Sequence, residues 1–388
     1  MHKVQSAIAR SKSIDHQLDE DREKKQKEVQ LLVLGGASSG KSTFIKQLRI
    51  HHGDGFPVDE RSKHTGDIYE NVSDALNLVL DHVKKFEGQC NLKENEVFAR
   101  SFQEMFPRWR HRYITKVCPS PVGAGVAMLE AEIVAVPCGM TQNECGPAPD
   151  YVRLREYCAQ ILALWRDVAV RNSLLRKHEF EPALVPAEEY FLEHLTRLLT
   201  PVYIPTLMDV LYIRKPTLGV QEHTFVSDGL SYRVIDVAGQ MNQRKKWIHF
   251  FDDVTAVFFF VSLSGYCETL EEDAMLNSLD DSLASFTEVI HNSFLVKTDF
   301  ILFLNKRDLF EKRIKSVPLN ACFQDYKGNS VSEALTFIKD QFTRRQPKDK
   351  TVYTHVSCAI DTELMRCIIR DVMNIIVEIN LRKANMPL

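Results

Sequence analysis

The 388-residue sequence has no long apolar stretch, no apolar segment at its start and no large excess of either charge. Its longest apolar run, around Thr255 to Leu263, is far shorter than the roughly 20 residues that a membrane-spanning helix requires. We therefore expect a soluble protein that is neither membrane-spanning nor secreted. The formal net charge of -3 gives no reason to expect nucleic acid as a partner.

The nine cysteines include no C-x-x-C pair. This odd number fits reduced thiols in the cytosol better than a disulfide framework. Three of them, Cys118, Cys138 and Cys145, lie in the stretch 118–150, which is rich in proline and glycine. Their irregular spacing without paired ligands argues against a zinc site. We expect this stretch to be a long surface loop.

A glycine-rich motif, GGASSGKST, occupies residues 35–43. It follows an apolar run at 29–34 and precedes the segment 44–48, which predicts a strand, a loop and a helix in that order. Backbone N–H groups of such a loop converge with a helix N-terminus, which suits a polyphosphate. A chance glycine turn is the alternative. The expected phosphate contacts come from Ser38, Ser39, Gly40, Lys41, Ser42 and Thr43, with Lys41 on the outer phosphates and Ser42 on Mg²⁺.

The base is indicated by a second motif, which follows the apolar run 300–304 and contains Asn305, Lys306 and Asp308. An aspartate there can accept hydrogen bonds from the ring N–H and the exocyclic amine of guanine, whereas adenine offers no such pair of donors. The carboxylate therefore favours GTP over ATP and argues against a P-loop ATPase or kinase. Cys358 and Ala359 follow the expected strand 351–356, where a backbone N–H can reach the guanine.

A third motif, IDVAGQ at 235–240, lies between the other two at the end of an expected strand. Asp236 suits water-mediated coordination of Mg²⁺, Gly239 can place its N–H near the γ-phosphate, and Gln240 can orient an attacking water. Upstream, Arg214 offers a guanidinium for developing phosphoryl charge. Thr217 offers a hydroxyl, so that Ser42, Thr217 and Asp236 form the expected metal site.

The rest of the sequence predicts a helical domain inserted into an α/β domain and a helix at the C-terminal end. Between 57 and 210 apolar residues recur at helical spacing, which predicts an inserted all-helical domain. Its three stripes involve Ile68, Val72, Ala75, Leu76, Val79 and Val83, then Leu154, Tyr157, Cys158, Ile161, Trp165 and Val168, and finally residues 188–192. A C-terminal stripe comprises Met365, Ile368, Ile369, Val372, Ile376 and Ile379. A strand at 220–226 is expected to turn at Asp228-Gly229 into the strand that carries Asp236.

With these motifs in this order, the sequence resembles the α subunits of heterotrimeric G proteins, with further matches in RKPTLG, RKKWIHFF, FLNKRDLF and SCA. The resemblance implies a Ras-like α/β domain with a mostly parallel sheet at 29–56 and 211–388, a helical insert at 57–210 and an N-terminal helix at 1–28. It implies that Arg214 is a built-in arginine finger and that Gln240 positions water, with Lys41 as the third catalytic residue. Further nucleotide contacts are implied for Asp167, opposite Lys306, and for Leu211 and Tyr212.

The resemblance also implies a function: a switch that hydrolyses GTP to GDP with Mg²⁺ and transduces signals from membrane receptors. Its implied partners are a βγ dimer, bound by the N-terminal helix and residues 244–247, a seven-helix receptor at the tail 381–388, an effector and GTPase regulators. No glycine follows Met1, and no cysteine precedes Cys90, so we expect no N-terminal lipidation. The expected location is cytoplasmic, and the sequence leaves open whether βγ attaches the protein to the inner face of the plasma membrane.

One alternative function remains open at the level of the sequence. Ala37 stands where the family has glycine, and its methyl group crowds the γ-phosphate position. That substitution favours a nucleotide-binding scaffold with little turnover.

Overall fold

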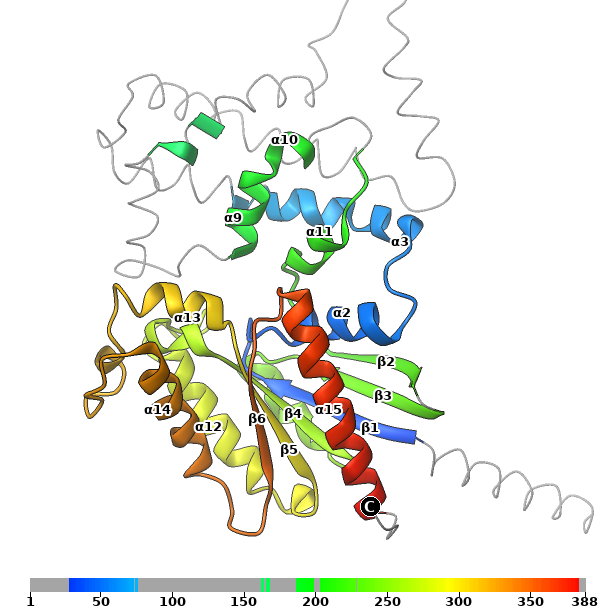
Figure 1. Ribbon diagram of the computed structural model, residues 1–388, viewed down its shortest axis with the longest axis vertical. Helices are drawn as coiled ribbons and strands as arrows, with labels where there is room; N and C mark the ends of the chain where they lie inside the picture. Colours follow the sequence, from blue (N-terminus) through cyan, green and yellow to red (C-terminus); the bar gives the residue numbers. More distant parts are fainter. Residues whose placement is uncertain are drawn as a thin grey trace, which may run out of the picture. The chain divides into compact units, whose positions relative to one another are not determined.

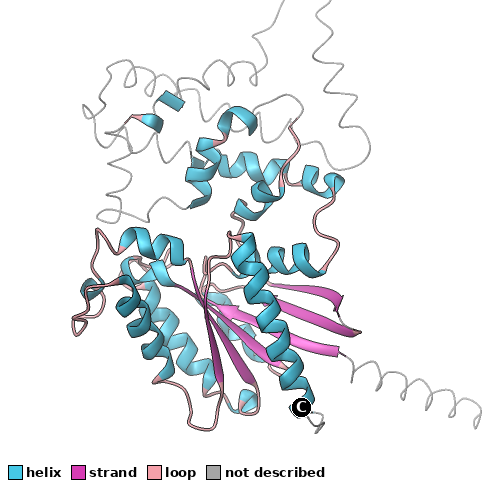
Figure 2. Cartoon of the chain, in the orientation of Figure 1, coloured by secondary structure: helices cyan, strands magenta, loops and turns pink. Residues whose placement is uncertain are grey.

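The computed structural model describes residues 28–72, 74–75, 162–163, 165–167, 186–198, 203–227 and 229–383 (Figures 1 and 2). The chain divides into two compact units, of which the first comprises Met1–Gly55 with Pro216–Leu388 and the second Phe56–Lys215. The predicted loop at 118–150 and all but the last residue of the predicted N-terminal helix lie outside the described residues. That last residue, Glu28, begins a strand.

A six-stranded sheet forms the centre of the first unit, in the order β2-β3-β1-β4-β5-β6 (Figure 1). Only β2 runs antiparallel to its neighbour, and all other neighbouring strands are parallel. Every residue of β4 is buried, as expected for a strand covered on both faces. The predicted α/β class with a mostly parallel sheet is confirmed. The strands are β1 (Glu28–Gly35), β2 (Val220–Ser227), β3 (Leu230–Val237), β4 (Ala256–Ser262), β5 (Asp299–Asn305) and β6 (Val352–Val356).

Helices cover both faces of this sheet (Figure 2). Successive strand side chains point to opposite faces, so Leu32 and Leu34 pack with one helix layer, and Leu31 and Val33 pack with the other. The first layer contains α12 (Ser278–Ile290), α13 (Arg307–Arg313) and α14 (Val331–Thr343). The second contains α2 (Lys41–His52) and α15 (Thr362–Lys383). Short 3₁₀ helices connect these elements: η2 (Met241–Phe250), η3 (Leu263–Cys267), η4 (Ser293–Leu295) and η5 (Leu319–Ala321).

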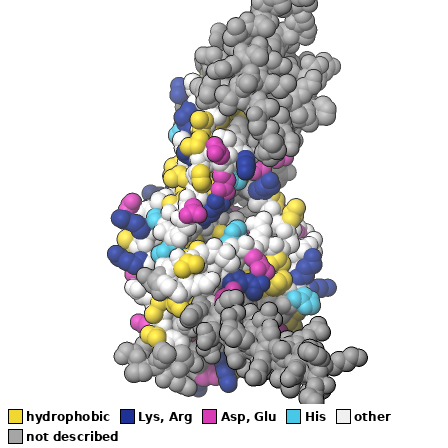
Figure 3. All heavy atoms as spheres, turned by 90° about the vertical axis from the view of Figure 1, so that its right-hand side faces the viewer, with side chains coloured by type: hydrophobic (Ala, Val, Ile, Leu, Met, Phe, Trp, Pro, Cys, Tyr) yellow, Lys and Arg dark blue, Asp and Glu magenta, His cyan; other side chains and the backbone are white. Residues whose placement is uncertain are grey.

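The helix α15 confirms the predicted C-terminal stripe. All six apolar residues of the stripe are buried, from Met365 to Ile379, and they pack on the sheet beside α2. None of the helices in the described ranges is long and apolar enough to cross a bilayer. The face drawn in Figure 3 carries acidic and basic side chains interspersed, in keeping with the small net charge.

The predicted hairpin between β2 and β3 is also present. Ser227 pairs with Leu230, and Gly229 adopts a φ of 76°, a value that side chains other than glycine rarely adopt. Because β3 also pairs in parallel with β1, Asp236 lies in register with Val33. This register brings the end of β3 beside the glycine-rich loop that follows β1.

The described residues of the second unit contain helices and no strand. Residues 65–72 are helical, and Ile68 and Val72 of the first predicted stripe are fully buried. Of the second stripe only Trp165 is described, and it is buried. The named helices are α3 (Val58–Lys63), α9 (Pro186–Glu193), α10 (Leu195–Leu198) and α11 (Leu207–Tyr212).

A buried carboxylate ties the helices of the second unit together. Asp209 of α11 is fully buried and accepts two hydrogen bonds of 2.7 Å from the Arg197 guanidinium. The hydroxyls of Tyr190 and Tyr203 donate at 2.8 Å, and the backbone N–H of Thr206 donates at 2.7 Å. Burial by itself would raise the pKa of Asp209, but these donors hold it well below its usual range.

We expect Asp209→Asn to lower the free energy of unfolding by on the order of 3 kcal/mol at pH 7, because Arg197 loses its buried counter-charge. The folded-state pKa of Asp209 lies below the unfolded value, so its stabilisation is present above about pH 4 and is lost as the pH falls through the folded-state value. Urea unfolding at several pH values measures this difference, which should shrink on acidification. The exposed Asp59→Asn serves as control, and equal stability of Asp209→Asn and wild type at pH 7 would contradict the prediction.

Candidate functional site

The glycine-rich loop joins β1 to α2 and requires glycine at two positions. Gly35 has a φ of 135°, and a Cβ there would lie 2.2 Å from the carbonyl oxygen of Phe260 in β4. Gly40 has a φ of 98°, and its Cβ would lie 2.0 Å from Nδ2 of Asn305. Any larger residue would push the loop away from the sheet. Ser38 also takes a positive φ, of 54°.

Side chains inside the loop hold it closed around a buried ammonium group. Lys41 is 5% exposed, and its Nζ donates to the carbonyl oxygens of Gly35 at 2.9 Å and Gly36 at 2.7 Å. The hydroxyl of Ser39 donates to the same Gly36 oxygen at 2.9 Å. Burial lowers the pKa of Lys41 to about 8, although the Asp236 carboxylate opposes the shift. An anion beside this ammonium would stabilise its charged form and so raise the pKa of Lys41.

The three residues predicted to bind a metal meet at one point of the first unit. The hydroxyl oxygens of Ser42 and Thr217 lie 2.8 Å apart. Each also donates to Oδ2 of Asp236, at 3.3 Å from Ser42 and 3.4 Å from Thr217. The three come from the start of α2, from the segment before β2 and from the end of β3.

This cluster has the chemistry of a magnesium site. Oδ1 of Asp236 is buried without any hydrogen-bond partner. Burial also raises the pKa of Asp236, against the opposing influence of Lys41 and the two hydroxyls. A buried, unpaired carboxylate oxygen beside two hydroxyls offers the hard oxygen ligands that Mg²⁺ takes, directly or through water. The residues therefore fit the ion.

Asn305 connects the loops on the predicted base side. Its Nδ2 donates to the Ser39 carbonyl at 2.8 Å, and its Oδ1 accepts from the Ala359 backbone N–H at 3.0 Å and from the Ser357 hydroxyl at 3.2 Å. The next residue, Lys306, has a φ of 63° and precedes α13. One buried amide thus joins the glycine-rich loop to the loop after β6.

The carboxylate of Asp308 lies on the same side. The segments that follow β5 and β6 are adjacent, because the Arg307 backbone N–H donates to the Ser357 carbonyl at 3.2 Å. Burial and the neighbouring Asp308 raise the pKa of the Cys358 thiol to about 12. The residues that the sequence assigned to the base therefore lie together at the carboxyl ends of β5 and β6, where α13 begins: Asn305, Lys306, Asp308, Cys358 and Ala359.

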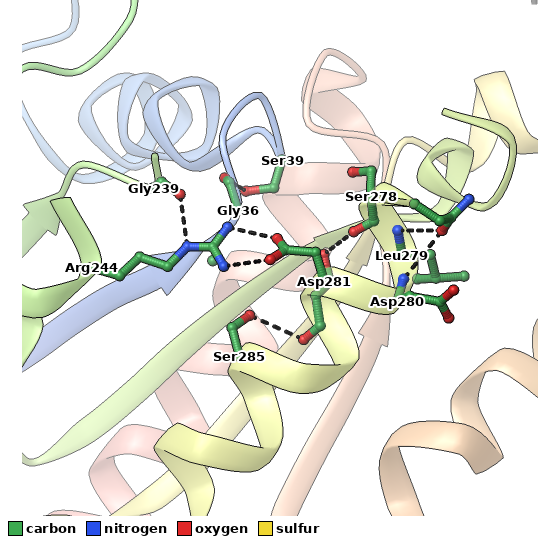
Figure 4. A network of polar contacts seen from close by, with 12 residues as sticks. Gly36, Ser39, Gly239, Arg244, Ser278, Leu279, Asp280, Asp281 and Ser285 are labelled. Carbon is green, nitrogen blue, oxygen red and sulfur yellow. Dashed lines mark hydrogen bonds and ion pairs between the residues drawn. The ribbon is translucent and has the colours of Figure 1, made fainter. Parts of the chain in front are cut away.

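The loop after β3 is fixed by an arginine that the sequence did not assign to the site (Figure 4). Arg244 makes a bidentate pair with Asp281 of α12, at 2.8 and 2.6 Å. Its Nε donates to the Gly239 carbonyl at 3.1 Å. Both partners of the pair are largely buried. Gly239 and the adjacent Gln240 are therefore held against α12, and no local pattern in the sequence signals this pairing.

Trp247 contacts the same loop. It is 3% exposed, its indole N–H donates to the Ala238 carbonyl at 3.0 Å, and the Arg244 guanidinium lies 5.8 Å above its ring. In contrast, Lys245 and Lys246 are exposed. Within the segment predicted to bind βγ, Arg244 and Trp247 thus face inward and the two lysines face solvent.

Four predicted site residues belong to the second unit. Asp167 is 7% exposed, Leu211 is 2% exposed, and the ring of Tyr212 stacks on Tyr190 at 3.9 Å. Arg214 is exposed, and its backbone bonds to Asn71, a contact that the sequence analysis did not foresee. The roles assigned to these four residues stay predictions.

Gly239 lies so close to the phosphate loop that we expect Gly239→Ala to displace its own loop. The added Cβ would lie 2.4 Å from both the Gly35 carbonyl oxygen and Lys41 Nζ. Because Trp247 donates to Ala238, its fluorescence emission should change, and the change should vanish in the Trp247→Phe background. Gly36→Ala is the matched control, since its Cβ would make only ordinary contacts, the nearest at 3.7 Å. An emission spectrum of Gly239→Ala identical to wild type would refute this expectation.

Comparison with known proteins identifies the family of this chain. A family model described as the G-protein alpha subunit matches residues 8–376. The guanine nucleotide-binding protein alpha-16 subunit of Caenorhabditis briggsae is 34% identical over 390 residues, which covers 100% of this chain and 99% of that protein. The match extends through both units, including the segment that contains the helical insert. The chain therefore belongs to the family of G-protein α subunits.

Proposed function

We propose that this α subunit is a molecular switch that binds GTP with Mg²⁺ and hydrolyses it to GDP and phosphate. The observation that carries the proposal is the convergence of Ser42, Thr217 and Asp236 beside the buried ammonium of Lys41. Two hydroxyls, a carboxylate with an unpaired oxygen and a cation at the start of a helix form a site for a metal-bound polyphosphate.

On this proposal the phosphates lie along the glycine-rich loop. Backbone N–H groups of Ser39, Gly40 and Thr43 would bind their oxygens, with Ser38 at the exposed rim. Ser42 and Thr217 would hold Mg²⁺ directly and Asp236 through water, and the ion would supply neutralisation of the charge on the outer phosphate oxygens. Lys41 would exchange its bonds to Gly35 and Gly36 for bonds to phosphate.

Hydrolysis would need two further groups. Gln240 would orient the attacking water, and Arg214 would stabilise the charge that develops on the transferred phosphoryl group. Water attacks the γ-phosphorus, the bond to the bridging oxygen breaks, and GDP and phosphate leave. Thr217 and Gly239 would lose their γ-phosphate contacts at that moment, which makes the two loops a switch.

Guanine selectivity would come from Asp308. A carboxylate that accepts from the two guanine donors is left unpaired by adenine, and an unpaired buried charge is strongly unfavourable. Asn305, which accepts from the Ala359 N–H, would keep the loop after β6 in place beside the base. Lys306 and Cys358 would complete the base side of the site, and nucleotide contacts are also proposed for Asp167, Leu211 and Tyr212.

As a member of this family, the protein is proposed to bind a βγ dimer, a seven-helix receptor, an effector and GTPase regulators. The exposed Lys245, Lys246 and Ile248 next to the switch loop provide charged and apolar surface for such a partner. We propose a cytoplasmic location, with attachment to the inner face of the plasma membrane through βγ.

A nucleotide-binding scaffold is the second candidate function, favoured by Ala37 in the phosphate loop. The two differ in the single-turnover rate of GTP hydrolysis by wild-type protein in Mg²⁺. Hydrolysis that chelation of Mg²⁺ abolishes supports the switch, and negligible hydrolysis supports the scaffold.

We expect Gln240→Leu to bind GTP normally but to hydrolyse it about a hundredfold more slowly, because losing one oriented transition-state contact costs on the order of 3 kcal/mol. Single-turnover hydrolysis and equilibrium binding of a non-hydrolysable GTP analogue measure the two effects separately. Gln243→Leu, one turn further along, is the control, because the Gln243 side chain accepts a hydrogen bond from the exposed Lys246 at 2.8 Å. A Gln240→Leu rate close to wild type would remove Gln240 from the mechanism.

We expect Asp308→Asn to weaken GTP and GDP binding by one to two orders of magnitude while leaving the weak binding of ATP unchanged. The physical reason is that the amide presents a donor to the guanine N–H groups in place of a carboxylate oxygen. Competition of GTP and ATP against a fluorescent guanine nucleotide measures the selectivity. Glu311→Gln, on the exposed face of the same helix, is the matched control. Equal loss for both nucleotides would mean that Asp308 does not read the base.

A further inference from the structure

Asn71 of the second unit binds both polar groups of the Arg214 backbone. Its Oδ1 accepts from the Arg214 N–H at 2.8 Å, and its Nδ2 donates to the Arg214 carbonyl at 2.9 Å. The Asn71 side chain is nearly buried, with 9% of the residue exposed. Asn71 and Arg214 are 143 positions apart in the sequence.

This pairing matters because Arg214 has no regular secondary structure to hold it. Residues 213–218 form neither helix nor strand. A backbone in that state samples many conformations, and fixing a residue in one of them costs roughly 1–2 kcal/mol of entropy. The side-chain amide of Asn71 supplies the donor and the acceptor that a neighbouring strand would otherwise supply. The Cα–Cβ direction of Arg214 is thereby fixed relative to the helix at 65–72.

The same helix face also contacts Lys215, the residue that follows Arg214. Asp67 lies four positions before Asn71, hence on the same face, and it accepts from Lys215 Nζ at 2.7 Å. Hydrogen bonds from His64 and Lys215 lower the pKa of Asp67 to about 2, despite its partial burial. The Lys215 side chain is 67% exposed, however, so this ion pair is screened and weak. Asn71 therefore contributes more to fixing the segment than Asp67 does.

The preceding helix fixes the segment from its other end. The helix α11 is anchored by the buried Asp209 and closes with a bond from the Ile213 N–H to the Val210 carbonyl at 3.3 Å. Arg214 follows directly. With α11 holding the chain before it and Asn71 holding its own N–H and C=O, Arg214 has little backbone freedom, while its side chain stays exposed.

We propose that Asn71 is a positioning residue for hydrolysis, which acts by holding the backbone from which the Arg214 guanidinium reaches the transferred phosphoryl group. The proposal rests on the proposed function, in which Arg214 acts on the transition state. A misplacement of about 1 Å in a catalytic group can cost about a hundredfold in rate. In the proposed site the nucleotide has many other contacts, so we expect its binding to depend little on Arg214.

The experiment is a double-mutant cycle on the full-length protein. Single-turnover GTP hydrolysis is measured for wild type, Asn71→Ala, Arg214→Ala and the double variant. We expect Asn71→Ala to be about 10- to 100-fold slower than wild type, and the double variant to be no slower than Arg214→Ala, since Asn71 acts through Arg214. Binding of a non-hydrolysable GTP analogue should change less than about threefold. Asp67→Asn, which weakens the contacts of Asp67 to Lys215 and His64 and leaves the pairing of Asn71 with Arg214 intact, is the matched control and should retain the wild-type rate.

A purely structural role of Asn71 would give a different pattern. It would lower thermal stability and GTP-analogue binding together, and its effect on hydrolysis would multiply with that of Arg214→Ala. Formation of the complex with GDP and aluminium fluoride, a mimic of the transition state, adds a second readout. Asn71→Ala should weaken this complex as much as it slows hydrolysis, without weakening the GTP-analogue complex.

Asn71→Asp keeps the inference testable if Asn71→Ala fails to fold. It preserves the shape and the acceptor for the Arg214 N–H, but places an oxygen against the Arg214 carbonyl. We expect slow hydrolysis in this folded variant, and a wild-type rate would overturn the inference. Suppose that wild type hydrolyses GTP and that Arg214→Ala slows hydrolysis. The inference alone then fails if the Asn71 variants keep the wild-type rate, or if their effect multiplies with that of Arg214→Ala. If wild type does not hydrolyse GTP, the proposed function fails and the inference fails with it.

Discussion

The first unit is organised around one buried positive charge, the ammonium group of Lys41. A buried ammonium needs several acceptors, and the loop supplies two carbonyls by folding back over it, which requires glycine at position 35. A counter-charge is needed as well, and Asp236 provides it because β3 pairs with β1 in a register that places Asp236 beside Val33. The carboxylate then gathers the hydroxyls of Ser42 and Thr217. The sheet order thus has a direct electrostatic consequence.

Two asparagine side chains serve as links where the backbone has no regular partner. Asn305 joins the phosphate loop to the loop after β6, and Asn71 binds the backbone of Arg214. Arg214 and Thr217 are only three residues apart, yet Arg214 is fixed within the second unit and Thr217 within the first. The arginine and the threonine that the proposed mechanism uses are therefore held by separate cores.

Those parts of the fold that depend on neighbours in sequence could be predicted. The strand, loop and helix around residues 35–43, the hairpin turning at Gly229 and the buried stripe of α15 all follow from periodicity and glycine placement. The convergence of Ser42, Thr217 and Asp236 was expected only from the chemistry of Mg²⁺. It agrees with the general rule that parallel strands end at the same edge of a sheet. The contacts of Asn71 and Arg244 could not be predicted, because a partner 143 or 37 residues away leaves no local pattern.

The pairing of Arg244 also constrains how a partner can use this surface. Three of its nitrogens are engaged, two with Asp281 and one with the Gly239 carbonyl, and the pair is largely buried. Separating a buried bidentate pair is strongly unfavourable unless both charges find new partners. A protein that binds the Arg244 guanidinium must therefore release Gly239 from α12. The Arg244 guanidinium cannot hold Gly239 and bind a partner at the same time, so it couples the loop after β3 to the surface beside it.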